Sequence, residues 1–238
     1  MSLVVITGGA SGIGRGMAQS FAELGHRVVI GDIKEEAGQR TAREIGVRFL
    51  RVDVTSATDV TAFIDAARAD ACFDVLIANV GRNDGLPTAR TKPTDWDRSI
   101  RVNLSSMFYT CRTALPYLSP GGSIIMTSSL VGVIGQRNSS AYAAAKGGII
   151  AYVKALALEL APRKITVNAI APGDVMTPAY EKWLKGQPPD TLVRIQAQIP
   201  LGRFAAPEEI GALAVFLASA RFITGQTIII DGGKSLGR

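Results

Sequence analysis

The feature that most constrains the fold is a short apolar segment that runs directly into a glycine-rich turn and then into a helical pattern. Residues 3–7 are apolar up to Thr7, residues 8–14 contain four glycines, and Met17, Phe21 and Leu24 recur at helical spacing before Gly25. An apolar run without alternation is typical of a parallel strand that is buried on both faces. The chain therefore begins with a strand-turn-helix unit of a parallel α/β fold.

This alternation of short apolar segments with longer helical ones continues along the chain. We expect further strands at residues 27–30, 47–52, 73–78 and 122–128, with helices between them. The pattern predicts a doubly wound parallel sheet of about seven strands with helices on both faces. A chain of 238 residues with 47% hydrophobic content can bury one large core, so we expect a single domain over residues 1–238.

The glycine-rich turn has the spacing Thr-Gly-x-x-x-Gly-x-Gly. Glycine lets the backbone approach a pyrophosphate closely, and a helix N-terminus offers free N–H groups and the positive end of a dipole. The turn therefore predicts a dinucleotide site with contacts from Gly8, Ser11, Gly12, Ile13 and Gly14.

Asp32 follows the second expected strand, about twenty residues after the glycine-rich turn. A carboxylate at this place can accept hydrogen bonds from the hydroxyls of the adenosine ribose, and it would repel a 2′-phosphate. Asp32 therefore favours NAD over NADP as the cofactor. The other interpretation is that Asp32 caps the helix that begins near Glu35.

A proton-transfer pair is predicted by Tyr142 and Lys146. On one helix these residues are neighbours at i and i+4. An ammonium beside a phenol favours the phenolate and lowers the pKa of the tyrosine. Ser129 ends the expected strand at residues 122–128, where a hydroxyl emerges at the carboxyl edge of the sheet, the edge at which such sheets hold ligands.

Composition argues against several other classes of protein. The net charge is +6, but the 26 Lys and Arg residues are scattered, whereas nucleic-acid binding needs a clustered basic surface. The single histidine, His26, argues against a His-rich metal site and a Ser-His-Asp triad, so we expect no metal centre. Cys72 and Cys111 are expected to be free thiols. The chain shows no signal-peptide pattern and no continuous apolar run long enough to span a membrane, so we expect a cytoplasmic protein.

Together these motifs resemble the classical short-chain dehydrogenase/reductase family, which has a Rossmann-type fold, from Thr7 to Gly233. Asn79-Val80-Gly81 is similar to the family's Asn-Asn-Ala-Gly, although Ala78 and Val80 replace its first Asn and its Ala. The segment from Pro172 to Thr177 resembles the one that holds the nicotinamide carboxamide. The resemblance adds these expected cofactor contacts: Asp53, Val54, Asn79, Gly81, Tyr142, Lys146, Pro172, Gly173, Val175 and Thr177.

The resemblance also implies a catalytic tetrad of Asn103, Ser129, Tyr142 and Lys146. Asn103, on a long fourth helix, would hold a water in a proton relay, and Ser129 would hydrogen-bond the substrate oxygen. Tyr142 would be the general base for alcohol oxidation and the general acid for the reverse, while Lys146 would also bind the nicotinamide ribose. The implied reaction moves a hydride between a secondary alcohol or ketone and the nicotinamide.

The substrate is expected to be a small polar molecule such as a sugar, a polyol or a hydroxy acid. Residues 177–201 occupy the position of the family's substrate lid, and the expected substrate contacts are Ser129, Gln136, Arg137, Tyr142 and Trp183. Arg82, Arg137 or Arg194 could read an anionic group on the substrate, because the guanidinium binds carboxylates bidentately.

Two other functions remain open at this stage. The same fold supports an NADPH-dependent reductase of 3-oxoacyl thioesters, although Asp32 argues against NADPH. A non-catalytic cofactor sensor is the second alternative, and the complete tetrad argues against it. Residues 141–160 form a helix that is apolar around most of its circumference, which favours a homo-oligomer, a dimer or tetramer as is usual in the family.

Overall fold

The computed structural model describes residues 2–69 and 71–237. Seven parallel strands form one sheet in the order β3-β2-β1-β4-β5-β6-β7, which confirms the predicted doubly wound α/β fold. The strands are β1 (Leu3–Thr7), β2 (Arg27–Asp32), β3 (Arg48–Arg51), β4 (Phe73–Ala78), β5 (Leu118–Thr127), β6 (Thr166–Pro172) and β7 (Thr227–Ile230).

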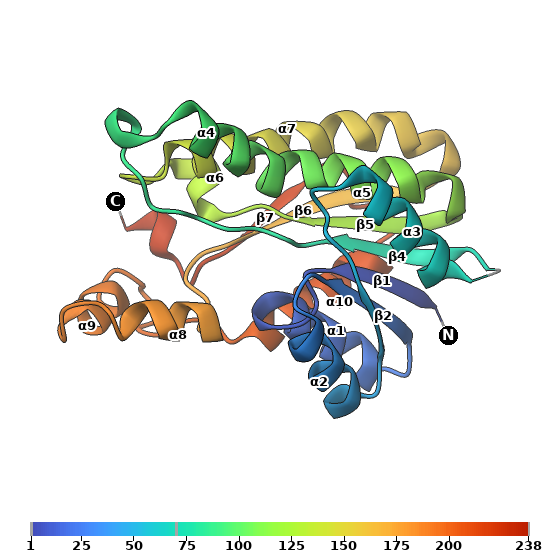
Figure 1. Cartoon of the computed structure of the whole chain (residues 1–238), viewed down its shortest axis with the longest axis horizontal. Helices are drawn as coiled ribbons and strands as arrows, with labels where there is room; N and C mark the ends of the chain where they lie inside the picture. Colours follow the sequence, from blue (N-terminus) through green and yellow to red (C-terminus); the bar gives the residue numbers. More distant parts are fainter. Residues whose placement is uncertain (1, 70, 238) are drawn as a thin grey trace.

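Helices cover both faces of the sheet (Figure 1). One face packs on α1 (Gly12–Glu23), α2 (Glu35–Ile45) and α10 (Pro207–Ser219), and the other on α3 (Ala57–Arg68), α5 (Ser106–Ala114) and α7 (Ser140–Leu160). The remaining helices, α4 (Pro93–Ile100), α6 (Leu130–Ile134), α8 (Pro178–Leu184) and α9 (Thr191–Gln196), gather at the end of the molecule where β5 and β6 terminate. Two separate apolar cores therefore hold the sheet rigidly between its helices.

The strand order reverses between β1 and β4. Beyond this point the loops after the two strands turn toward opposite faces and leave a crevice between them, which is the general ligand position in open α/β sheets. The glycine-rich turn follows β1 and Asn79 follows β4, so both expected cofactor motifs lie at the reversal.

The long fourth helix expected around Asn103 is interrupted. The helical run from α4 to α5 passes through a π-helical turn, η2 (Arg101–Ser105), which contains Asn103. Single π turns of this kind are frequent at functional sites. Other boundaries differ from the expected ones by a few residues, chiefly at β5, which begins at Leu118 rather than at residue 122.

Helix α7 is the longest in the described part of the chain and packs along β6 and α6. By length and composition alone, the stretch Ser140–Arg163 could cross a membrane, and 33% of its most apolar window is buried in the protein. A helix packed in a protein core passes the same test, so the finding is weak evidence for a membrane span.

Candidate active site

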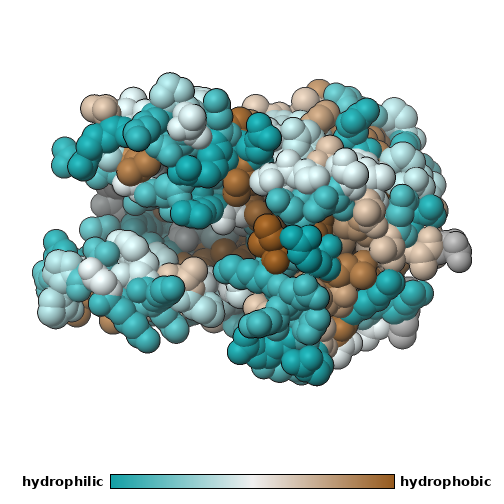
Figure 2. Space-filling view, viewed as in Figure 1, coloured by the Kyte–Doolittle hydropathy of each residue, from teal (hydrophilic) through white to brown (hydrophobic). Residues whose placement is uncertain are grey.

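A cleft of about 770 Å³ opens at the carboxyl edge of the sheet. The space-filling view shows this end of the molecule hollowed between the part that carries α4 and α6 and the part that carries α8 and α9 (Figure 2). The cleft is lined by every expected cofactor residue except Gly14 and Val175, and it brings together Ser129, Tyr142 and Lys146.

The glycine-rich turn is shaped by positions that have no room for a side chain. Gly8 and Gly12 have positive φ angles of +71° and +55°, which favour glycine. A Cβ on Gly14 would lie 2.0 Å from the carbonyl oxygen of Gly8, so the first turn of α1 packs directly on the loop. Ser11 precedes α1 and makes no side-chain capping bond, which leaves the N–H groups of the helix end for a ligand. This geometry fits a bound pyrophosphate.

Asp32 stands at the tip of β2, where two backbone amides orient its carboxylate. The N–H of Ala10 donates to Oδ2 at 3.2 Å and the N–H of Lys34 donates to Oδ1 at 3.0 Å. The N-cap residue of α2 is Lys34, so the interpretation of Asp32 as the helix cap is wrong. Asp32 instead lines the cleft, in the place expected for a ribose ligand.

Asn79 links three strands behind the cofactor end of the cleft. Its Nδ2 donates to the carbonyl of Gly8 at 3.2 Å, and its Oδ1 accepts a hydrogen bond from Thr127 at 2.9 Å. Its backbone N–H donates to Thr7 Oγ1 at 3.3 Å. The side chain therefore holds the loops after β1, β4 and β5 in register with one another.

Ser129, Tyr142 and Lys146 meet because α6 and α7 approach each other closely. A Cβ on Gly132 would lie 2.6 Å from the backbone of Lys146, and Ser128 Oγ donates to the carbonyl of Lys146 at 2.8 Å. Ser129 caps α6 by accepting from the N–H of Val131 at 3.2 Å. These contacts fix the hydroxyl of Ser129 beside the first turns of α7, which carry Tyr142.

The pKa values of Tyr142 and Lys146 are shifted in a different way from the one expected. Lys146 is 1% exposed, its Nζ donates to the carbonyl of Thr127 at 2.7 Å, and burial lowers its pKa to about 7. Burial raises the pKa of Tyr142, and the hydrogen bond with Ser129 offsets part of that rise. The Nζ atom lies 5.7 Å from the centroid of the Tyr142 ring. The predicted lowering of the Tyr142 pKa by Lys146 is therefore wrong for the protein alone, because desolvation outweighs the distant amine.

Asn103 is fully buried, and its side chain does not line the cleft. Its Oδ1 accepts from the N–H of Arg82 at 2.7 Å, while Nδ2 donates to the carbonyls of Arg82 at 2.9 Å and Ser99 at 3.0 Å. The amide group therefore fixes the backbone after β4 instead of pointing at a substrate.

Three of the expected substrate residues lie away from the cleft wall. Gln136 and Arg137 are exposed after α6, and Trp183 is 47% exposed on α8, with its ring against Tyr180. The lid segment, residues 177–201, instead reaches the cleft through Thr177, Pro178 and Ala179 at the start of α8.

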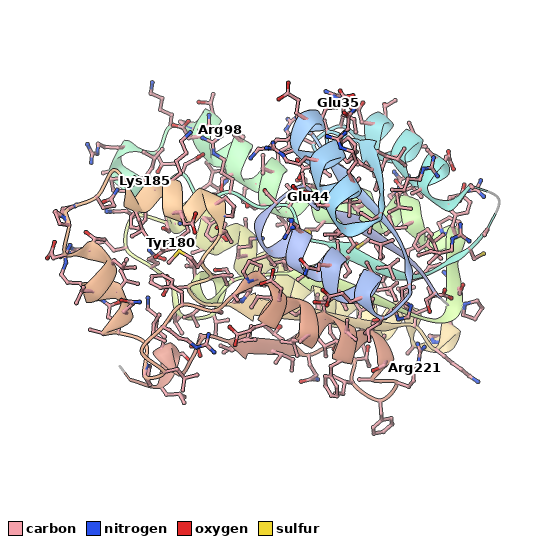
Figure 3. All side chains as sticks on the ribbon, turned by 90° about the horizontal axis from the view of Figure 1, so that it is seen from below. Glu35, Glu44, Arg98, Tyr180, Lys185 and Arg221 are labelled. Carbon is pink, nitrogen blue, oxygen red and sulfur yellow. The ribbon has the colours of Figure 1, made fainter. Side chains whose placement is uncertain are left out.

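A half-buried ion pair connects Asp174, in the loop between β6 and α8, to the short turn Lys234–Leu236. Lys234 Nζ lies 2.6 Å from Asp174 Oδ2, with the two side chains 18% and 16% exposed. Tyr180, labelled on α8 in Figure 3, donates from its hydroxyl to the other oxygen of Asp174 at 3.0 Å. Burial and this carboxylate raise the pKa of Tyr180, so its hydroxyl stays protonated as the donor. The turn at Lys234 and the loop after β6 thus together hold α8 in place.

Several residues that line the cleft were not expected from the sequence. They follow the carboxyl ends of the strands or neighbour expected residues, and this placement could have identified them: Ile33, Lys34, Val52, Thr55, Val80, Val102, Thr127, Ser128, Pro178 and Ala179. Arg82, one of the arginines considered from the sequence as a ligand for an anionic group, also lines the cleft, and Thr127 bonds to both Asn79 and Lys146.

The chain is similar to known enzymes over nearly its whole length. Residues 8–235 match the family model described as "Enoyl-(Acyl carrier protein) reductase". The chain is 39% identical to L-fucose dehydrogenase of Oryctolagus cuniculus over 99% of this chain and 85% of that protein. It is 39% identical to cis-4-hydroxycyclohexanecarboxylate dehydrogenase of Sinomonas cyclohexanicum (97% and 95% covered) and 38% identical to 3-oxoacyl-acyl-carrier-protein reductase of Thermotoga maritima (96% of each).

A solved structure from Brucella melitensis, described as "Short-chain dehydrogenase/reductase SDR:Glucose/ribitol dehydrogenase", has the same fold. It matches with a TM-score of 0.92 at 32% identity and covers 98% of this chain and 96% of that one. The cleft, the motif order and these matches agree: the chain belongs to the classical short-chain dehydrogenase/reductase family, a family of oxidoreductases that act on CH–OH groups with a nicotinamide cofactor.

Proposed function

We propose that the protein is an NAD-dependent dehydrogenase of small polar secondary alcohols and the corresponding ketones, of the sugar, polyol or hydroxy acid type. The observation that carries this proposal is the Asp32 carboxylate, which two backbone amides orient in the same cleft as Tyr142. A fixed carboxylate at the ribose position suits the two hydroxyls of NAD and repels the 2′-phosphate of NADP. Names of relatives that act on a sugar and on a hydroxy acid support the substrate class.

We infer that residues 1–238 are one nicotinamide-binding domain with a substrate lid at residues 177–201. The pyrophosphate would lie over Gly8, Ser11, Gly12 and Ile13, with Gly14 supporting the turn from behind. The adenosine would lie between Asp32 and the pair Asp53 and Val54, and the nicotinamide end would lie among these residues: Asn79, Gly81, Pro172, Gly173 and Thr177. Val175 is 4% exposed and would support this last segment from the core.

The reaction needs a proton acceptor beside the alcohol, and Tyr142 would fill that role. A bound nicotinamide supplies the hydride acceptor or donor. Ser129 would hold the substrate oxygen and polarise it, while Tyr142 takes the hydroxyl proton during oxidation and returns it during reduction. Lys146, held by Thr127, would bind the nicotinamide ribose, and Asn103 would act by fixing the backbone at Arg82.

The cofactor preference is tested by one substitution. Wild-type protein is expected to form NADH from alcohols in a panel of sugars, polyols and hydroxy acids, with at least about tenfold lower kcat/KM with NADP. Asp32→Ala is expected to weaken NAD use about 10–100-fold because two ribose hydrogen bonds to a charged group are lost, and to narrow or reverse the preference. Glu44→Ala, an exposed carboxylate on α2, is the matched control. An unchanged NAD/NADP ratio in Asp32→Ala would contradict the proposal.

A second candidate is an NADPH-dependent reductase of 3-oxoacyl thioesters. The description of the matching family model and the relative from Thermotoga maritima favour it. The same panel includes acetoacetyl thioesters with NADH and NADPH. Efficient NADPH-dependent reduction of the thioester, without oxidation of small alcohols by NAD, would establish this candidate in place of the first.

We further infer a homo-oligomer, most simply a tetramer with two kinds of interface. Helices α5 and α7 expose Phe108 (45%) and Leu158 (79%), and the opposite region around β7 exposes Phe216 (55%), Phe222 (103%) and Ile229 (40%). Exposed apolar side chains grouped in this way are typical of subunit contacts. Sedimentation equilibrium at micromolar concentration is expected to give a dimer or a tetramer, and a stable monomer would exclude the inference. The free thiols of Cys72 and Cys111 suit a reducing compartment, so we place the protein in the cytoplasm.

A further inference from the structure

Arg82 is the one arginine among the residues that line the cleft in the described part of the chain. It follows Gly81 at the end of β4 and lines the cleft together with Ser129, Tyr142 and Lys146. A Cβ on Gly81 would lie 2.9 Å from Lys146 Nζ, so the chain just before Arg82 passes close to the amine. The other two arginines considered from the sequence lie elsewhere: Arg137 is exposed after α6, and Arg194 pairs with Asp190 on α9 at 3.0 Å.

The backbone of Arg82 is fixed from both sides by one buried side chain. Asn103 Oδ1 accepts from the N–H of Arg82 at 2.7 Å, and Asn103 Nδ2 donates to the carbonyl of Arg82 at 2.9 Å. Asn103 is itself 0% exposed. The backbone of Arg82 is therefore held in place, although its side chain is 73% exposed.

The guanidinium is oriented through only one of its donors. Nε of Arg82 donates to Asp84 Oδ1 at 2.6 Å. The other oxygen of Asp84 accepts from Nη2 of Arg98 at 3.2 Å, and Arg98 also binds Asp95 at 2.8 Å. Figure 3 shows Arg98 on α4. The cluster therefore contains two guanidinium groups and two carboxylates, and the short contact with Asp84 fixes the direction of the Arg82 side chain through Nε alone.

The outer edge of the Arg82 guanidinium remains available. In the part of the chain that the structure describes, neither Nη atom of Arg82 forms a hydrogen bond or an ion pair. Two parallel N–H groups in a fixed plane match the two oxygens of a carboxylate. A substrate that fills the cleft would also displace water from this exposed cation, which strengthens the contact.

We propose that the substrates of this enzyme are hydroxy acids, or the corresponding keto acids, whose carboxylate binds to the Nη edge of Arg82 while the hydroxyl lies between Ser129 and Tyr142. This proposal rests on the proposed dehydrogenase function and selects one class within it. Asp84 is a positioning residue for Arg82, and Arg98 is a positioning residue for Asp84. Arg82 forms no covalent bond with the substrate, and the carboxylate is chemically unchanged in the product.

The kinetic test compares an acid with its amide. Substrates are 4-hydroxycyclohexanecarboxylate and 3-hydroxybutyrate, each with its neutral carboxamide, and NAD is the cofactor. Wild-type kcat/KM is expected to be at least about tenfold higher for the acids. Arg82→Gln is expected to lower kcat/KM about 10–100-fold for the acids, mainly through KM, and less than about twofold for the amides. Arg82→Lys should restore part of the loss. The control is Arg112→Gln, which replaces an exposed arginine on α5 and should leave kcat/KM unchanged for both the acids and the amides.

A binding measurement covers the case in which neither alcohol is a substrate. Calorimetry with the NADH complex is expected to detect cyclohexanecarboxylate binding to wild type, and binding about 10–100-fold weaker to Arg82→Gln. Cyclohexanecarboxamide should bind both proteins equally weakly. Three results would each overturn the proposal: equal kcat/KM of wild type for acid and amide, an equal fall in kcat/KM for both in Arg82→Gln, or no binding of cyclohexanecarboxylate to wild type. The dehydrogenase function would still hold in that case if wild type oxidises neutral alcohols with NAD. If wild type oxidises no alcohol with NAD, the dehydrogenase function is itself refuted.

Discussion

Tyr142→Phe is expected to reduce turnover by about 10³-fold or more, because the substitution removes the only hydroxyl that the proposed mechanism uses to take up the substrate proton. The ring remains, so the packing of α7 on α6 is retained. Binding of NADH is expected to stay within about threefold of wild type, because the contacts proposed at the glycine-rich turn, at Asp32 and at Lys146 are unchanged. Steady-state kinetics and a fluorescence titration with NADH measure the two quantities.

The control for this experiment is Tyr109→Phe, which removes a phenol hydroxyl from α5 outside the cleft wall. It is expected to keep wild-type kinetics. If Tyr142→Phe retains more than about a tenth of the activity, Tyr142 is not the general base. If it loses NADH binding in parallel with activity, its role lies in the cofactor site instead of in proton transfer.

Gly14→Ala is expected to destabilise the protein by about 3 kcal/mol or more and to abolish cofactor binding. The added methyl group would lie 2.0 Å from the carbonyl oxygen of Gly8 and 2.7 Å from Nδ2 of Asn79. The first of these atoms belongs to the backbone, so it cannot turn away as a flexible side chain would. The glycine-rich turn and α1 must separate, and the N–H groups of the helix end move with them.

Thermal unfolding and an NADH titration test both effects. For a domain of this size, about 3 kcal/mol corresponds to a fall in Tm of about 6–12 °C. Gly186→Ala is the matched control, because a Cβ there would lie 3.6 Å from its nearest neighbour, the carbonyl of Trp183, at ordinary contact distance. Similar melting temperatures for the two variants would show that the turn tolerates the methyl group and that the close packing at Gly14 is not required.

The sequence was most informative where structure depends on neighbouring residues. Apolar runs predicted β1 and β4 to the residue, and the turn between β1 and α1 was recognised from its glycine spacing. The pair Tyr142 and Lys146 was expected on one helix and lies on α7. These features follow from hydrogen bonds and side-chain periodicity within short stretches of chain, so the local sequence is sufficient to specify them.

Interactions across segments were not predictable in the same way. The proton-relay role of Asn103 stays a prediction, and the structure adds hydrogen bonds between its amide and the backbone of Arg82, in a loop that no local pattern describes. Trp183 was expected at the substrate but packs against Tyr180 beside the cleft. The ion pair of Lys234 with Asp174 joins residues sixty positions apart and had no sequence signal.

The sequence by itself determined the fold class, the family and most of the expected cofactor residues that meet at the carboxyl edge of the sheet, because their motifs lie within a few residues of a strand end. Only the tertiary structure decided the electrostatics of that set. Lys146 lies 5.7 Å from the Tyr142 ring and donates to Thr127, so burial dominates the pKa of the phenol. Arg82 is directed by Asp84 and anchored by Asn103, which selects it among three candidate arginines. Desolvation and hydrogen-bond partners are set by segments that pack together only after folding, so the charges in the cleft could not be read from the order of residues.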